Sequence, residues 1–216
     1  MARPNSSPTP PRISEPDVPD ELVPGIPARR AQLHAARLDL NGEVDLAYAD
    51  LDQCALAVDA DTVDMTGATI VDCDLKDVRA ASFVMRNANL RRLRIRGGRI
   101  GTLDLSGTRI DELELRDLRV DYLSFGGAKG HDILIADCML RALDTPQAQL
   151  TRVSFENTRA DEFDTGGMRV SDFDLRGLDT LSFLDTNSLR GVTLSIDQAE
   201  RIAVTLARTV GINVVL

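Results

Sequence analysis

The sequence predicts an all-β solenoid, in which short extended segments stack in successive coils. Three observations predict it. From Val63 to Ser182 the chain divides into twelve consecutive ten-residue blocks without insertion or deletion. The first residue of every block is apolar, and the third, sixth and eighth are mostly apolar or small. The fifth is Gly, Asp or Asn in eleven blocks, with Gln147 as the exception.

These spacings define a unit of five residues, with two side chains pointing inward and three outward. The inward residues lie two and then three apart, whereas a helical face returns at three and four. Two side chains on one face at i and i+2 indicate a short extended segment. Gly, Asp and Asn tolerate turn conformations, so we expect the chain to turn at the ends of these segments. The first-position residues are Val63, Cys73, Phe83, Leu93, Leu103, Leu113, Leu123, Ile133, Leu143, Val153, Phe163 and Phe173.

Three stretches carry a specific resemblance. AYADLDQ (47–53), RNANLRR (86–92) and DLSGTRI (104–110) resemble the pentapeptide-repeat proteins, in which a small residue, a polar residue, Leu or Phe and two polar residues recur. The resemblance runs from about Leu38 to Phe183. It implies a right-handed, four-sided β-helix of about seven coils, in which residues twenty apart form ladders.

The ends of the chain differ from this array. Residues 1–32 hold eight of the nine prolines, which predicts a disordered or polyproline-like arm. They contain no apolar run typical of a secretory signal or a membrane span. We expect the β-helix over residues 33–186. Between Leu40 and Val63 the five-residue step is displaced by one residue, which predicts a bulge or an irregular first coil.

Residues 187–216 predict a capping helix and a short strand. Ser195 and Gln198 form a capping box, an apolar stripe follows, and Gly211 ends the helix. We expect the helix to cover the open end of the solenoid, where bare strand edges invite aggregation. A compatible alternative is a homodimer interface, a role that the C-terminal element has in the quinolone-resistance members of the resembled family. The candidate cap or dimer residues are Ile202, Leu206 and Val210.

The sequence predicts no catalytic, cofactor or metal site. His131 stands beside Asp132 at an outward position and is interpreted as a surface residue rather than part of a Ser-His-Asp arrangement. Cys54, Cys73 and Cys138 lack metal-ligand spacing and fall at inward positions. Buried free thiols are typical of a reducing compartment, so we expect a cytoplasmic protein.

Charge is the remaining indicator of function. The net charge of −9 argues against direct nucleic-acid binding. Eleven acids and one base lie between Asp39 and Asp77, whereas six arginines and no acid lie between Arg86 and Arg99. Acids recur at the second position of the blocks and bases at the seventh. These residues form either a solvated surface with ion pairs or a surface that binds a partner. The candidate partner-binding residues are Asp64, Asp74, Asp104, Glu114, Asp144, Asp164, Asp174, Arg94, Arg96 and Arg99.

Three functional hypotheses follow. The first is a non-catalytic, rigid, charged rod for protein–protein interaction, with an unidentified partner. The resemblance implies the second, an acidic DNA mimic that binds DNA gyrase and modulates fluoroquinolone sensitivity. The Arg86–Arg99 belt counts against this alternative, because a duplex mimic is continuously negative. The third, an enzyme, has the least support in the sequence.

Overall fold

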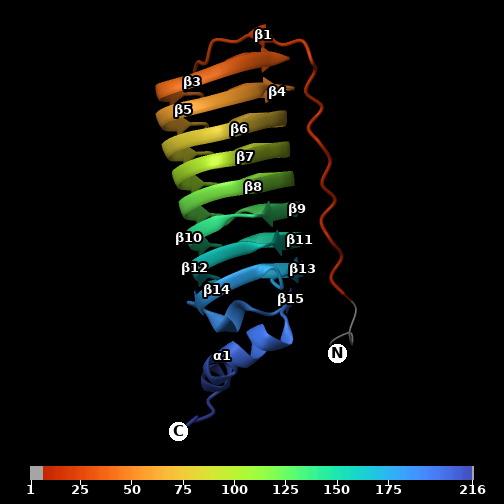
Figure 1. The fold of residues 1–216 in the computed structure, drawn as a ribbon, viewed down its shortest axis with the longest axis vertical. Helices are drawn as coiled ribbons and strands as arrows, with labels where there is room; N and C mark the ends of the chain where they lie inside the picture. The colour runs from red at the N-terminus through yellow and green to blue at the C-terminus, as the bar shows by residue number, and fades with distance from the viewer. Residues whose placement is uncertain (1–6, 216) are drawn as a thin grey trace.

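The computed structural model describes residues 7–215 and confirms a parallel β-solenoid with a single C-terminal helix (Figure 1). It has about eight coils rather than the seven expected, because residues 23–34 already pair with the coil that follows them. The strands are β1 (Val23–Pro24), β2 (Gln32–His34), β3 (Ala36–Asp45), β4 (Asp50–Asp52), β5 (Ala55–Asp64), β6 (Thr69–Val84), β7 (Asn89–Asp104), β8 (Arg109–Ser124), β9 (Lys129–Ala136), β10 (Met139–Asp144), β11 (Gln149–Glu156), β12 (Thr158–Asp164), β13 (Arg169–Asp174), β14 (Leu178–Phe183) and β15 (Val192–Thr193). A 3-10 turn (Thr186–Ser188) and helix α1 (Ile196–Thr209) complete the fold.

Successive coils stack with the expected twenty-residue register. Leu93 of β7, for example, pairs with Leu113 of β8. The first coils are shorter, since Arg37 pairs with Ala55. Register shifts after Gly42 and after Ala57 absorb the difference, which confirms the predicted irregular start.

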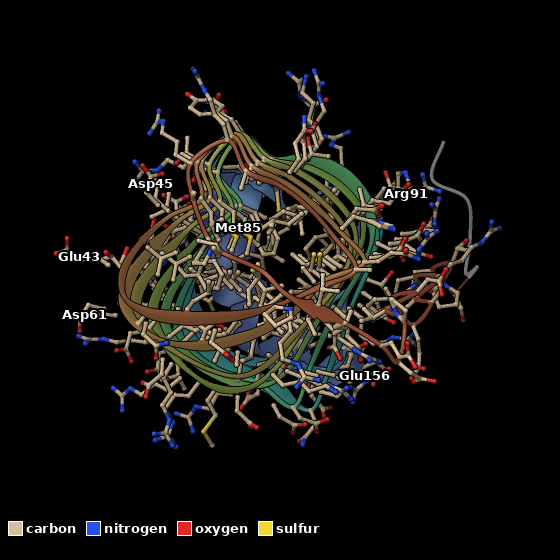
Figure 2. The ribbon with its side chains drawn as sticks, turned by 90° about the horizontal axis from the view of Figure 1, so that it is seen from above. Glu43, Asp45, Asp61, Met85, Arg91 and Glu156 are labelled. Atoms are coloured by element: carbon tan, nitrogen blue, oxygen red, sulfur yellow. The ribbon has the colours of Figure 1, made fainter. Side chains whose placement is uncertain are left out.

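Each regular coil has four walls of five residues. Wall 1 is centred on Met65, Met85, Leu105, Phe125, Thr145 and Thr165; wall 2 on Ile70, Leu90, Ile110, Gly130, Leu150 and Val170; wall 3 on Leu75, Ile95, Leu115, Ile135, Phe155 and Leu175; wall 4 on Ala80, Ile100, Val120, Leu140, Ala160 and Thr180. Met85 lies inside the column in the axial view of Figure 2.

Ladders of inward side chains fill the column. Leu93 and Leu113 are almost fully buried, and the rings of Phe163 and Phe183, one coil apart, have centroids 5.8 Å apart. Burial of such ladders supplies about 25 cal/mol per Å² of apolar surface. The three cysteines are buried and unbonded, as predicted.

Left-handed backbone turns the chain at three of the four corners. Ten of the eleven predicted Gly, Asp and Asn turn residues adopt it, for example Gly67 with φ 68° and Asp77 with φ 53°, whereas Gly177 does not. Even Gln147, the departure from the pattern, has φ 57°. The corner between walls 2 and 3 is also left-handed, although it carries residues such as Arg92, with φ 48°. The sequence showed no turn preference there.

Helix α1 covers the C-terminal end of the solenoid. The capping box of Ser195 and Gln198 is present, and the buried Gln198 amide donates to the carbonyls of Leu175 (2.7 Å) and Leu178 (2.8 Å). Residues 212–215 form no strand, contrary to expectation, because they lie beyond the helix and away from the last sheet edge (Figure 1). Among residues 7–215, no helix is long and apolar enough to cross a membrane.

The N-terminal arm, which its composition predicts to be disordered or polyproline-like, lies along the rod from residue 7 onward (Figure 1). Residues 7–22 run back along the outside of the rod, from β1 past β13 (Figure 1). Hydrogen bonds from Thr9, Arg12, Ser14 and Asp17 attach this segment to the coils.

Candidate functional site

The ten residues predicted to bind a partner do not form one surface. Because each wall repeats every twenty residues, the blocks send their second positions to walls 1 and 3 and their seventh positions to walls 2 and 4. Wall 1 carries Asp64, Asp104, Asp144 and Asp164; wall 3 carries Asp74, Glu114, Asp174, Arg94 and Arg96; wall 4 carries Arg99.

On wall 1 the acids stabilise the turns that follow them. Asp64 accepts a hydrogen bond from the Thr66 amide (2.8 Å), and Asp164 accepts one from Gly166 (2.8 Å). Asp104 accepts from the Ser106 amide (2.9 Å) and pairs with Arg86. Burial of Asp104 opposes ionisation, but these bonds outweigh it and lower its pKa. Such carboxylates are largely used within the fold.

On wall 3 the acids pair with bases one coil away or two residues along the same coil. The side chain of Asp74 is 8% exposed and lies 3.1 Å from Arg94, 3.0 Å from Arg96 and 3.3 Å from Lys76. Its burial opposes ionisation, but the cations, with Arg94 first, lower its pKa overall. Glu114 pairs with Arg116 at 2.8 Å.

The same pairs neutralise the arginine belt. Of the six arginines between Arg86 and Arg99, all except Arg91 form ion pairs. Their partners are Asp104, Asp72, Asp74 and Asp121. The belt is therefore not the free positive surface that its sequence indicated.

Free carboxylates gather instead on the first coils, on and beside wall 4. We call this group the acidic end. Its members are Asp39, Glu43, Asp59 and Asp61, which are exposed and form no ion pair within residues 7–215. Figure 2 shows Glu43 and Asp61 pointing away from the column, on the side opposite the arm. None of the four was among the predicted site residues, although the run of eleven acids against one base contained the signal.

Wall 2 carries a shallow groove of about 770 Å³. Arg91, Arg109 and Lys129 line it, over a floor that includes Ile110 and Gly130. A Cβ at Gly130 would lie 2.6 Å from that of Ile110, so only glycine allows the two coils to approach this closely.

The groove also contains His131, which bears on the enzyme hypothesis. Its Nδ1 lies 2.9 Å from Asp132 and 3.5 Å from Asp111. Asp132 is already occupied by Arg152 and by the arm, which leaves it unsuited to act as a proton acceptor. In the part of the chain that the structure describes, no hydroxyl or thiol is hydrogen-bonded to the His131 ring. The geometry thus assembles no nucleophile–base pair there.

The corner between walls 2 and 3 holds the arm. We call its residues the arm column: Asp72, Arg92, Glu112, Asp132, Arg152 and Asp172. Each arginine of this column lies between two acids. Arg152 binds Asp132 through Nε (2.7 Å) and Nη2 (2.6 Å). Arg92 binds Asp72 in the same two-pronged way. The ion pairs offset the cost of left-handed backbone at non-glycine residues, about 1–2 kcal/mol each.

The remaining acceptor capacity of the column binds the arm. Main-chain amides of Thr9, Arg12 and Asp17 donate to Asp172 (2.9 Å), Asp132 (2.9 Å) and Asp72 (3.0 Å), respectively. The Ser14 hydroxyl donates to Glu112 at 2.7 Å. Asp72 and Asp132 have side chains only 5% and 6% exposed. Their pKa values are lowered, chiefly by Arg92 and Arg152 and further by the arm amides.

No family model and no curated protein matches the sequence. Similar solved structures include two trypsin-treated variants of QnrB1, a plasmid-mediated fluoroquinolone resistance protein. One is 13% identical with a TM-score of 0.40 and covers 87% of this chain and 100% of that chain. The other is 18% identical with a TM-score of 0.39 and covers 88% and 94%.

A third similar structure is HetL, a pentapeptide repeat protein involved in heterocyst differentiation regulation from the cyanobacterium Nostoc sp. strain PCC 7120. It is 16% identical with a TM-score of 0.34 and covers 76% of this chain and 90% of that chain. At such low TM-scores the likeness carries no argument about function. The fold assignment rests on the twenty-residue register and on the corners described above.

Proposed function

We propose that this chain, a pentapeptide-repeat protein, is a non-catalytic, rigid rod that binds a protein partner through its acidic end. The observation that carries the proposal is the contrast between two kinds of acid. Most acids along the middle of the rod are held in turns or ion pairs, whereas Asp39, Glu43, Asp59 and Asp61 are exposed and unpaired within the described residues.

Rigidity supports this role. The inward ladders fix the backbone of the first coils, so the four carboxylates are held in place before any partner arrives. A preorganised surface spends less entropy on binding, and an excess of negative charge speeds the encounter with a basic partner. We therefore expect a partner with a basic surface.

A neutralised variant tests the proposal. The tagged wild-type chain should retain basic proteins from a lysate of its own cells, and retention should fall as salt rises. The variant carries Asp39→Asn, Glu43→Gln, Asp59→Asn and Asp61→Asn. A control with the same change in net charge carries Asp117→Asn, Asp161→Asn, Glu162→Gln and Glu200→Gln. Equal retention by the two variants would contradict a role for the acidic end.

DNA mimicry of the kind that acts on DNA gyrase is the second candidate. The ion pairs of the arginine belt favour it, because they remove the positive break that counted against a continuous negative surface. The exposed bases of wall 2, Arg91 and Arg109 among them, count against it. A supercoiling assay with purified gyrase tests this candidate. If micromolar protein neither inhibits supercoiling by gyrase nor protects gyrase from a fluoroquinolone, the candidate is rejected.

A homodimer through the C-terminal element belongs to the same proposal. Ile202 packs on the core and Leu206 is half-buried, so these two act in the cap, whereas Val210 is 73% exposed. Val204 (45%) and Ile212 (56%) are also exposed. Light scattering after size exclusion tests the dimer, and a monomer at every concentration would contradict it.

A further inference from the structure

We propose that the arm column is a binding site for proline-rich polypeptide segments in the polyproline II conformation. The chain's own residues 7–19 are then its resident occupant, and a proline-rich segment of the protein partner displaces them. This deepens the function proposed above and rests on the protein-binding role stated there.

The spacing of the column matches the ligand. Thr9 binds at Asp172 and Arg12 at Asp132, so three residues of the arm span two coils. Two coils rise roughly 9.6 Å at about 4.8 Å each. Three residues of polyproline II rise roughly 9.3 Å. Asp17 then reaches Asp72, three more coils beyond Asp132, after five residues, at nearly the same rise per residue.

The donors of the arm reveal what the column recognises. Each of the three amide donors directly follows a proline: Pro8, Pro11 or Pro16. These prolines are half-buried, whereas the side chains of Thr9 and Arg12 are exposed. Proline fixes φ near −65° and has no amide of its own, so it presets the backbone and leaves the next N–H to donate. The column therefore binds mainly a main-chain pattern, proline followed by a free amide, to which the Ser14 hydroxyl adds one side-chain contact with Glu112.

The acceptor side chains of the column suit this ligand. Asp72 and Asp132 are buried carboxylates, each held by an arginine on one side and by an arm amide on the other. Amides bound to ionised acceptors form stronger hydrogen bonds than neutral pairs. Two flanking contacts add to the fit: Arg94 lies 3.2 Å from Glu15, and Gln53 donates to Asp17 at 3.2 Å.

The arm is attached by a short connection, so it competes with any partner from within the chain. A tethered segment acts at an effective concentration in the mM range. A segment that stays bound under those conditions needs an intrinsic Kd below about 1 mM. This Kd is the upper limit that the peptide must meet in the experiment below.

The experiment vacates the column without changing it. In the full chain, Thr9→Pro, Arg12→Pro and Asp17→Pro remove the three amide donors and preserve polyproline II, because each follows a proline. Alanine at the same three positions keeps the donors and serves as the control. A fluorescein-labelled peptide of residues 7–22 is titrated into each protein, and its anisotropy is measured.

We expect the peptide to bind the proline variant with a Kd below about 1 mM and at least tenfold more weakly to the alanine variant, whose column is filled. Adding Glu112→Gln and Asp172→Asn to the proline variant should weaken binding at least tenfold. Neither residue forms an ion pair within residues 7–215, so the coils stay folded. No saturable binding up to 1 mM, or equal binding to all three proteins, would overturn the proposal.

Two further outcomes are decisive. If the wild-type chain dimerises and the peptide dissociates the dimer, the occupant is the arm of a second copy and the separate partner is overturned. The acidic end lies on the opposite side of the rod (Figure 2), so its neutralisation should leave peptide binding unchanged. Loss of peptide binding with retained salt-dependent capture would reject this site alone and leave the proposed function intact.

Discussion

Asp132→Asn is the substitution that most directly tests the structure of the arm column. Asp132 accepts two hydrogen bonds from Arg152 (2.7 and 2.6 Å) and one from the Arg12 amide (2.9 Å). Asparagine keeps the shape and tolerates the left-handed backbone (φ 60°), but it removes the charge and one acceptor oxygen. The perturbation is therefore electrostatic and local.

The expected loss follows from burial. Hydrogen bonds to charged groups contribute about 1.5–3 kcal/mol each when buried. Arg152 is 25% exposed, so water compensates part of the loss of its partner. We expect the free energy of unfolding to fall by about 2 kcal/mol, measured by urea titration. For a chain of this size the melting temperature should fall by roughly 4–8 °C.

Asp137→Asn is the matched control. Asp137 also sits at a left-handed corner (φ 55°), but its side chain is 38% exposed and its pair with Arg116 (3.1 Å) faces solvent. An exposed pair of this kind contributes less than about 1 kcal/mol. Equal losses in the free energy of unfolding from the two substitutions would refute the view that the buried ion pairs of the arm column stabilise the rod.

The remaining predictions concern pH, the core and the cap. Because Arg92 and Arg152 lower the pKa of Asp72 and Asp132, the stability from these carboxylates is complete above their ordinary pKa near 4 and is lost as the pH falls below it. The melting temperature should thus fall from pH 5 to pH 3, and a constant value would contradict this cause. Leu113→Asp should unfold the rod, as read by circular dichroism, because the residue is fully buried, whereas Asp111→Ala at an exposed position should cost less than about 0.5 kcal/mol. Gln198→Ala should cost about 1–3 kcal/mol in urea unfolding, because it removes a buried side-chain donor from the carbonyls of Leu175 and Leu178; no change would reject the capping role.

The repeat made the coils predictable because every inward and turn position is constrained locally. The ladder of Leu93 and Leu113, the turn at Gly67 and the capping box at Ser195 were all visible as patterns in the sequence. The docking of the arm was not predictable from its composition, which describes a segment alone and omits the surface that receives it. Its contacts, such as Thr9 with Asp172, join residues 163 positions apart.

The arrangement of the candidate partner-binding residues was hidden for a related reason. The pattern showed that Asp74 and Asp104 point outward, but outward residues also meet the neighbouring coils. Asp74 and Arg94 are twenty residues apart, the interval that places them side by side. A search for opposite charges at that interval would have found the Asp74–Arg94 pair, although Asp59, which has Arg79 at the same interval, forms no ion pair within residues 7–215.

Three arm residues span two coils, and this match restricts how such a rod can change length in evolution. Inserting one coil would move every downstream acceptor by about 4.8 Å, which is half of a polyproline turn, so the arm would have to change its residue spacing, as it does between Arg12 and Asp17, which span three coils. Inserting two coils together with three arm residues would keep both series in phase. A duplication of forty residues with three added arm residues should therefore disturb these contacts less than a duplication of twenty.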